Sequence, residues 1–285
     1  MRGAGRGGGD RRFGFAETSR SAFTGGELIR YRRDIPRITL HIGNYSYVPT
    51  FDFTPGYRGG CRDGGARAAV ADPKAKEVDC TRMKCVALTF DDGPGKYAGK
   101  LLDILKEHDA KATFFLEGQY VKSRPAYVKR MVKEGHAVGN HSYAHPDFTK
   151  STPATIRNEI KKTNDAIKKA AGVEPKLLRP PYGMSDLQVQ DIAVEFGMPI
   201  ILWTGGSRDW ESKNEEKIKK QTLSVAKGNS IVLMHDWVKQ TVDAMPSIIK
   251  TLQRNGYHLV TVDDVIKHEE LKPGDVFPLP EGWEQ

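Results

Sequence analysis

Short apolar runs alternate with helix-like patterns over most of the chain. The first run, residues 86–90, ends in Asp91-Asp92-Gly93-Pro94, and leucines at helical spacing follow from about residue 98. A short apolar run bounded by turn residues predicts a buried strand, and apolar positions three and four residues apart predict a helix. This segment is therefore predicted to form a strand, a loop and a helix.

The same alternation continues to residue 268. Further strands are predicted at 112–116, 137–139, 176–178, 199–203, 230–234 and 258–260. Helices are predicted at 126–134, 153–171, 186–196, 215–226, 241–254 and 262–268. Repeated strand and helix units predict an α/β fold with a parallel sheet or a β/α barrel.

The part of the chain before the first run has a different character. It is rich in glycine and arginine to about residue 60 and shows no periodicity, although an aromatic stretch at 42–53 could form an irregular strand or hairpin. Its opening is similar to nucleic-acid-binding tails, but a disordered leader or a misplaced start codon is favoured. We predict a partly disordered extension at 1–84, a folded domain at 85–268 and a tail at 269–285.

Composition narrows the class of protein. The chain has 285 residues, of which 38% are apolar and 28% charged, as in a globular enzyme. No stretch approaches the apolar length of a membrane span, and the first residues lack the apolar core of a signal peptide. The net charge of +8 favours an anionic neighbourhood, but much of the lysine lies on predicted helix faces, so no nucleic-acid partner is predicted.

The chain contains three cysteines, Cys61, Cys80 and Cys85, and no C-x-x-C pair. Cys80 and Cys85 flank a short segment before the first strand. A local disulfide in an oxidising compartment and two free thiols both fit this spacing.

Polar side chains follow several of the predicted strands. In a β/α barrel such positions lie at the carboxyl ends of the strands, where active sites are built. The residues concerned are Asp91, Asp92, His141, His145, Arg179, Tyr182, Asp209, His235 and Asp236.

Two of these groups suit a metal. Asp91 and Asp92 are adjacent, so on an extended backbone one carboxylate can bind an ion while the other stays free. His141 and His145 are four residues apart and can face one ion from a helical turn or a tight loop. Two histidines and a carboxylate leave a coordination position open for chemistry. The alternatives are a plain Asp-Asp-Gly-Pro turn and a chance H-x-x-x-H spacing.

Other strand ends offer complementary groups. Arg179 precedes two prolines and Tyr182, a rigid turn that could hold the guanidinium near a carboxylate and present the Tyr182 amide to an oxyanion. His235 ends an apolar strand and could protonate a leaving group near neutral pH. Trp203 and Trp210 could stack on sugar rings, although core packing is an equal alternative for Trp203.

Taken in order, these groups resemble the five motifs of the polysaccharide deacetylase (NodB homology) family, carbohydrate esterase family 4. The resemblance runs over residues 85–266. The matching segments are Thr89-Phe90-Asp91-Asp92-Gly93, His141-Ser142-Tyr143-Ala144-His145, Arg179-Pro180-Pro181-Tyr182, Asp209-Trp210 and Leu233-Met234-His235-Asp236.

The resemblance implies a distorted (β/α) barrel with its catalytic domain at 85–268, and a divalent metal, most often Zn²⁺, with Co²⁺ or another borderline ion possible. Carried over by position, Asp92, His141 and His145 would be the metal ligands. Asp91 would be the base that takes a proton from water, and Arg179 would orient it.

The same resemblance assigns the remaining residues. The Tyr182 amide would bind the oxyanion, and Tyr182 would also contact the substrate. His235 would be the acid that protonates the departing group, and Asp209 would tether it. Trp210 and Leu233 would form the walls of the acetyl pocket.

The implied function is hydrolysis of N-acetyl groups on a polymer containing N-acetylglucosamine, either chitin-type or peptidoglycan, by a monomer that is secreted or associated with the cell wall. The alternatives are an O-acetyl xylan esterase that uses the same residues and a non-catalytic carbohydrate-binding protein on the same fold. One departure concerns the fourth motif, where the family has D-x-x-D-W and this chain has Gly206 in place of the first aspartate. This puts the substrate in more doubt than the chemistry.

Overall fold

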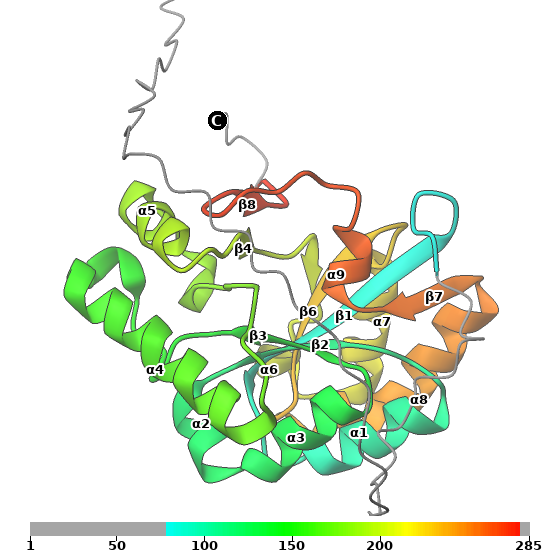
Figure 1. Cartoon of the computed structure of the whole chain (residues 1–285). Helices are drawn as coiled ribbons and strands as arrows, with labels where there is room; N and C mark the ends of the chain where they lie inside the picture. Colours follow the sequence, from blue (N-terminus) through cyan, green and yellow to red (C-terminus); the bar gives the residue numbers. More distant parts are fainter. Residues whose placement is uncertain (1–77, 280–285) are drawn as a thin grey trace, which may run out of the picture. The chain divides into compact units, whose positions relative to one another are not determined.

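The computed structural model describes residues 78–279. Its centre is strand β1 (Lys84–Gly93), which pairs in parallel with β2 (Thr113–Leu116), β6 (Ser230–His235) and β7 (Tyr257–Val260). β3 (Ala137–Asn140) extends the sheet beyond β2, and β5 (Gly205–Gly206) extends it beyond β6. The strand order is β3-β2-β1-β6-β5, with parallel pairing throughout, and β1, β2, β3 and β6 are labelled in Figure 1.

The sheet curves towards closure. β4 (Ile200–Ile201) pairs with β8 (Val276–Phe277), and bridges from Leu178 to Asn140 and to Ile200 continue the pairing from β3 to β4. β4 therefore follows β3 at one end of the sheet, through Leu178, and β5 forms the other end. β4 and β5 are close in sequence, so the two ends of the sheet approach each other. This is a distorted (β/α) barrel, as predicted, although the predicted strand at 176–178 is reduced to the single bridge at Leu178.

Both faces of β1 are buried, which explains its continuous apolar run. Val86, Leu88 and Phe90 pack in one core cluster together with the outer helices. Ala87 belongs to a second cluster, which fills the interior of the barrel. The members of this cluster that lie in strands or directly beside a strand bridge are Ala87, Phe115, Leu177, Ile201, Ile231 and Val260.

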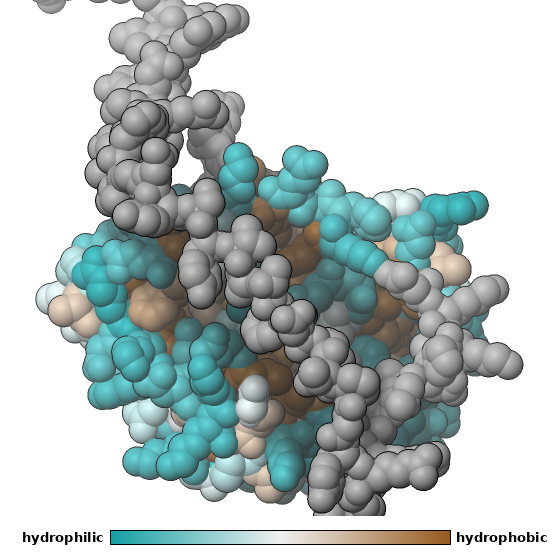
Figure 2. All heavy atoms as spheres, viewed as in Figure 1, coloured by the Kyte–Doolittle hydropathy of each residue, from teal (hydrophilic) through white to brown (hydrophobic). Residues whose placement is uncertain are grey.

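The helices lie around this sheet (Figure 1), and in Figure 2 hydrophilic side chains occupy much of their outward surface. Their bounds are α1 (Ala98–Glu107), α2 (Gly118–Ser123), α3 (Pro125–Lys133), α4 (Pro153–Ala171), α5 (Leu187–Glu195), α6 (Asp209–Ser212), α7 (Glu215–Val225), α8 (Lys239–Arg254) and α9 (Val262–Val265).

Local chemistry sets the ends of α4, whose predicted bounds are confirmed. The Thr152 side chain accepts a hydrogen bond from the Thr155 amide, Pro153 occupies the first turn, and Gly172 ends the helix with a φ of 76°. The predicted helix at 262–268 is shorter, since α9 ends at Val265. α2, α6, β5 and β8 were not predicted.

Cys80 and Cys85 form a disulfide, which decides between the two alternatives for this pair. Cys61 and the predicted stretch at 42–53 lie outside the described residues. The predicted domain boundaries stay predictions, although β8, inside the predicted tail, pairs with β4. Between residues 78 and 279, no helix is long and apolar enough to cross a bilayer.

Candidate metal and catalytic site

A cavity of about 450 Å³ lies at the carboxyl ends of β1, β3 and β6. Its walls contain all of the predicted site residues except Arg179, Asp209 and Asp236, which are fully buried. The lining residues are Asp91, Asp92, His141, His145, Tyr182, Trp203, Trp210, Leu233, His235 and Trp237. The structure therefore brings the residues of all five motifs together.

The two adjacent aspartates point to different partners because β1 is irregular at its end. Asp91 is still in register with Phe115 and His235, but the register shifts between Asp91 and Gly93. Asp92 has a φ of 62°, in the left-handed region that non-glycine residues rarely adopt. One carboxylate thus faces the interior, and the other faces the two histidines.

Asp92, His141 and His145 form a possible three-ligand set for a metal. Oδ1 of Asp92 lies 3.3 Å from Nε2 of His141 and 3.4 Å from Nε2 of His145. Ligand atoms at about 2.1 Å from one ion in tetrahedral geometry would be about 3.4 Å apart. Oδ1 is buried and has no hydrogen-bond partner among the described residues. The donor types, the separations and this unpaired atom fit a cation.

The loop that carries the histidines is fixed by hydrogen bonds from outside it. The Asn140 side chain accepts from the Ser142 amide, and Ser142 Oγ accepts from the His145 amide. The buried carboxylate of Glu159, on α4, accepts from the amides of Tyr143 and Ala144. His141 Nδ1 lies 2.6 Å from the Arg179 carbonyl, to which it donates, so Nε2 keeps a free lone pair towards Asp92.

Arg179 is completely buried, and all its contacts are internal. Its guanidinium donates to Asp91 Oδ1 at 2.8 Å, to Thr89 Oγ1 and to the carbonyls of Ile201 and Leu202. These bonds hold one oxygen of Asp91. The other, Oδ2, lies 3.8 Å from His141 Nε2.

The opposite wall of the cavity contains a hydrogen-bonded acid and base pair. His235 Nδ1 lies 2.8 Å from Asp209 Oδ1, and Asp209 also accepts from the His235 and Trp210 amides and the Thr241 hydroxyl. Burial disfavours a charged imidazole, but the hydrogen bond and charge of Asp209 outweigh it and raise the pKa of His235 to about 9. This pKa favours the protonated imidazole at neutral pH.

Aromatic side chains form the rim of the cavity. Tyr182 is 63% exposed and Trp210 is 54% exposed. The Tyr182 ring lies 4.6 Å from that of His145, and its backbone has a φ of 61°. Trp237 donates from its indole nitrogen to Asp92 Oδ2 at 3.2 Å. Exposed rings at a cavity mouth suit the apolar faces of sugars.

Several supporting residues were missed by the sequence analysis. Trp237 directly follows His235 and Asp236, so its place at a strand end was a usable signal. Asn140, Glu159 and Thr241 act through contacts between elements distant along the chain, and no local pattern indicates them.

Comparisons with known proteins identify chains that are similar to this one. A family model described as polysaccharide deacetylase matches residues 78–201. Peptidoglycan-N-acetylglucosamine deacetylase PgdA of Listeria monocytogenes is 42% identical over 194 residues, which are 68% of this chain and 40% of that protein. A bifunctional xylanase/deacetylase of Pseudobutyrivibrio xylanivorans is 41% identical over 196 residues, 67% of this chain and 32% of that protein.

A solved structure described as T48 deacetylase with substrate is also similar. It has 44% sequence identity and a TM-score of 0.68, and the match covers 70% of this chain and 99% of that one. By contrast, the chain spans well under half the length of the two curated relatives.

Proposed function

Because the chain belongs to the polysaccharide deacetylase family, we propose that it is a metal-dependent hydrolase that removes N-acetyl groups from a polysaccharide containing N-acetylglucosamine. One observation carries the proposal. A three-ligand set (Asp92, His141 and His145), a separate carboxylate (Asp91) and a protonated imidazole (His235) line the same cavity. Together these groups can activate a water, polarise a carbonyl and protonate a leaving amine.

Asp92, His141 and His145 would hold a divalent ion, for which nitrogen and oxygen donors favour Zn²⁺ or Co²⁺ over Mg²⁺. When bound, such an ion supplies positive charge that polarises the acetyl carbonyl and makes a water easier to deprotonate. His141 and His145 act as neutral imidazoles in this role.

Asp91 is the base in this proposal. Its Oδ1 is occupied by Arg179, and its Oδ2 accepts the proton of the attacking water. Arg179 fixes the orientation of the carboxylate and balances its charge in a buried setting. The backbone amide of Tyr182 donates to the oxygen that becomes negative as water attacks the carbonyl carbon.

His235 is the acid on the other side of the acetamido group. It gives its proton to the nitrogen as the bond between carbon and nitrogen breaks, since an amine leaves only when protonated. Asp209 keeps Nδ1 bonded, so Nε2 carries the transferable proton. Trp210 and Leu233 exclude water from the methyl group of the acetyl.

An O-acetyl ester of xylan is a second candidate substrate, supported by similarity to a relative named a bifunctional xylanase/deacetylase. The N-acetyl substrate is favoured because an alcohol leaving group depends less on an acid than an amine does, and His235 is held protonated.

The disulfide between Cys80 and Cys85 supports a site of action outside the cytosol, either secreted or at the cell wall. Peptidoglycan is therefore the favoured polymer, as in the Listeria relative's name. We also propose that the protein acts as a monomer.

Mass spectrometry of acetylated glycans after incubation with the protein tests the function. The panel holds N-acetylglucosamine oligomers, peptidoglycan glycan strands and acetylated xylan. We expect loss of acetyl groups from the first two and slower loss from xylan. No acetyl loss from any member, in a metal-loaded and folded sample, would indicate a carbohydrate-binding protein instead.

A further inference from the structure

A second cavity of about 320 Å³ adjoins the catalytic one. The two share Asp92 and Trp237, so a polymer whose acetamido group reaches the metal ligands would place a neighbouring unit in the second cavity. Its lining residues are Asp92, Gly95, Lys96, Glu117, Tyr120, Arg124 and Trp237.

The second cavity combines aromatic and cationic groups. Trp237 and Tyr120 are each 37% exposed and offer ring faces to a sugar. Arg124 lies with its guanidinium carbon 5.3 Å from the centre of the Tyr120 ring, and its Nη1 donates to the Pro94 carbonyl at 2.8 Å. These two contacts fix the arginine at the cavity wall.

Neither cation of this cavity has an acidic partner. Within residues 78–279, no carboxylate lies within ion-pair distance of Lys96 or Arg124, and Lys96 contacts the Tyr97 ring instead. A fixed guanidinium and a free ammonium beside a sugar platform suit a carboxylate.

The cavity on the other side of the catalytic site differs. It has a volume of about 400 Å³ and is lined by Gly205, Gly206 and Arg208 together with Trp203 and Trp210. Arg208 is already paired with Glu211 at 2.8 Å. Among the described residues, the lining of this third cavity therefore offers no unpaired cation, whereas Lys96 and Arg124 are unpaired in the lining of the second.

Two acidic residues, Asp92 and Glu117, also line the second cavity, and Asp92 belongs to the proposed ligand set. The Glu117 side chain is buried and accepts a hydrogen bond from Gln119. Burial raises the pKa of Glu117 to about 7, so its negative charge is partial at neutral pH. It therefore opposes an anionic ligand only weakly.

We infer that the second cavity is a subsite for a sugar that carries a carboxylate, adjacent to the sugar that loses its acetyl group, and that Lys96 and Arg124 bind this carboxylate. This inference rests on the proposed deacetylation. It makes an acidic glycan, in which an N-acetylhexosamine alternates with a carboxylated sugar, a better substrate than neutral N-acetylglucosamine oligomers.

The test compares two tetrasaccharides that differ in one group. Both contain N-acetylglucosamine next to a sugar with an ether-linked acid side chain, which is a free carboxylate in one and its primary amide in the other. Acetate release and equilibrium binding are measured with the full, metal-loaded chain at low and high salt. We expect the carboxylate form to be preferred about 10-fold in kcat/KM and in affinity at low salt, and less at high salt.

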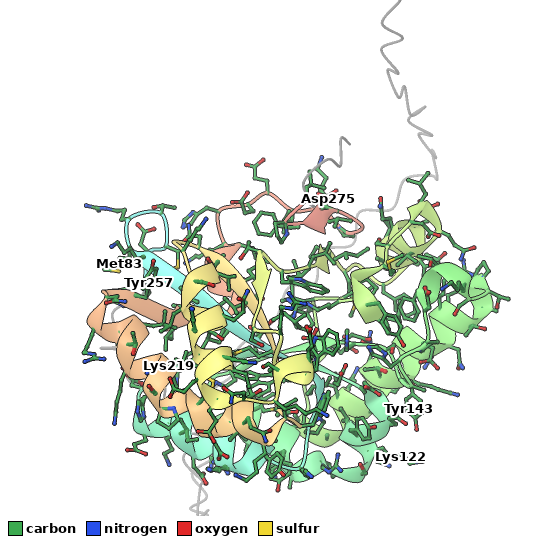
Figure 3. The ribbon with its side chains drawn as sticks, turned by 180° about the vertical axis from the view of Figure 1, so that it is seen from behind. Met83, Lys122, Tyr143, Lys219, Tyr257 and Asp275 are labelled. Atoms are coloured by element: carbon green, nitrogen blue, oxygen red, sulfur yellow. A yellow bond between two sulfur atoms is a disulfide. The ribbon has the colours of Figure 1, made fainter. Side chains whose placement is uncertain are left out.

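Lys96→Gln is the test variant, and it should reduce this preference to about 3-fold or less. Lys122→Gln is the matched control, because Lys122 is exposed on α2, lies outside the cavity lining and points away from the ribbon in Figure 3. The control should keep the full preference.

The results separate the two proposals. Tighter binding of the carboxylate form without acetate release would support the subsite and overturn the proposed hydrolysis. Acetate release with equal rates and affinities for the two forms would support hydrolysis and overturn the subsite. A preference that Lys96→Gln and Lys122→Gln leave equally intact would also overturn the subsite.

Discussion

The two walls of the catalytic cavity differ in how their polar atoms are satisfied. On one wall, Asp92, His141 and His145 direct ligand atoms at one another, and Asp92 Oδ1 has no hydrogen bond within the described residues. On the other wall, Asp209 accepts hydrogen bonds from His235, Trp210 and Thr241, which hold the imidazole.

Two of the three possible ligand residues also have a left-handed backbone. Asp92 and His145 have φ values of 62° and 60°, whereas His235 lies at the regular end of β6. Strained residues persist where the surroundings fix them, and they are concentrated at functional sites. The first wall can therefore accept a cation, whereas the polar atoms of the second wall are satisfied by protein groups. Loss of a ligand residue should remove the metal from the first wall. Substitutions in the second wall should change proton transfer and leave the metal content unaltered.

The largest effect is expected from His141→Ala. It removes one of three ligands and the bond to the Arg179 carbonyl, so the protein should lose its metal and about 10³-fold or more of its activity. Metal content by atomic spectroscopy and acetate release check this. A variant that retains one equivalent of metal would exclude His141 as a ligand.

Asp91→Asn separates the base from the ligands. The amide can still accept from Arg179 but takes a proton poorly, so activity should fall about 10³-fold while metal content stays at the native level. Because Arg179 is buried and loses its charged partner, stability should fall by about 3 kcal/mol, which thermal unfolding measures. An empty metal site in this variant would reverse the roles of Asp91 and Asp92.

His235→Ala tests the second wall. Turnover of N-acetylglucosamine oligomers should fall about 10²-fold, because the amine is no longer protonated, whereas turnover of an aryl acetate should fall less than about 10-fold. Metal content should not change. Equal losses on both substrates would show that this imidazole does something other than protonate the leaving group.

Asp209→Asn should give a smaller defect of the same kind, about 10-fold. An acid works in its protonated form, so native activity on the amide should fall as pH rises through the pKa of His235, which is about 9. Asp209 raises this pKa, so its neutral replacement should move the falling limb of the pH profile to lower pH. A limb that stays in place would mean that another group sets it.

The smallest effect is expected at the support of the first wall. Glu159→Ala removes the acceptor of the Tyr143 and Ala144 amides, so the histidine loop should loosen and metal affinity should weaken about 10-fold. Glu159→Gln is the control, since its amide oxygen can accept the same bonds. Metal titration measures both, and equal affinities for the native protein and Glu159→Ala would show that the loop is fixed by other contacts.

Long periodic elements could be predicted from the sequence. β1 and α4 are examples. Burial on both faces of β1 gives a continuous apolar run, and the residues at the two ends of α4 are typical of helix ends. The two-residue strands β5 and β8 have no periodicity, and their pairing with β6 and β4 depends on the closed barrel. They could not be predicted.

Part of the site could be predicted in the same way. Its polar residues directly follow apolar strands, and the carboxyl ends of barrel strands meet at one face, so these residues were expected to lie together. The left-handed backbone of Asp92 and the support of the loop by Glu159 depend on packing between distant segments, and only the structure reveals them.

Metal reconstitution tests the central claim most directly. The full chain is stripped with a chelator, verified as metal-free, and titrated with Zn²⁺ or Co²⁺ while acetate release from N-acetylglucosamine oligomers is followed. The account predicts no release without metal, recovery that saturates at one equivalent, and no recovery for His141→Ala. Full activity of the verified metal-free protein would contradict it.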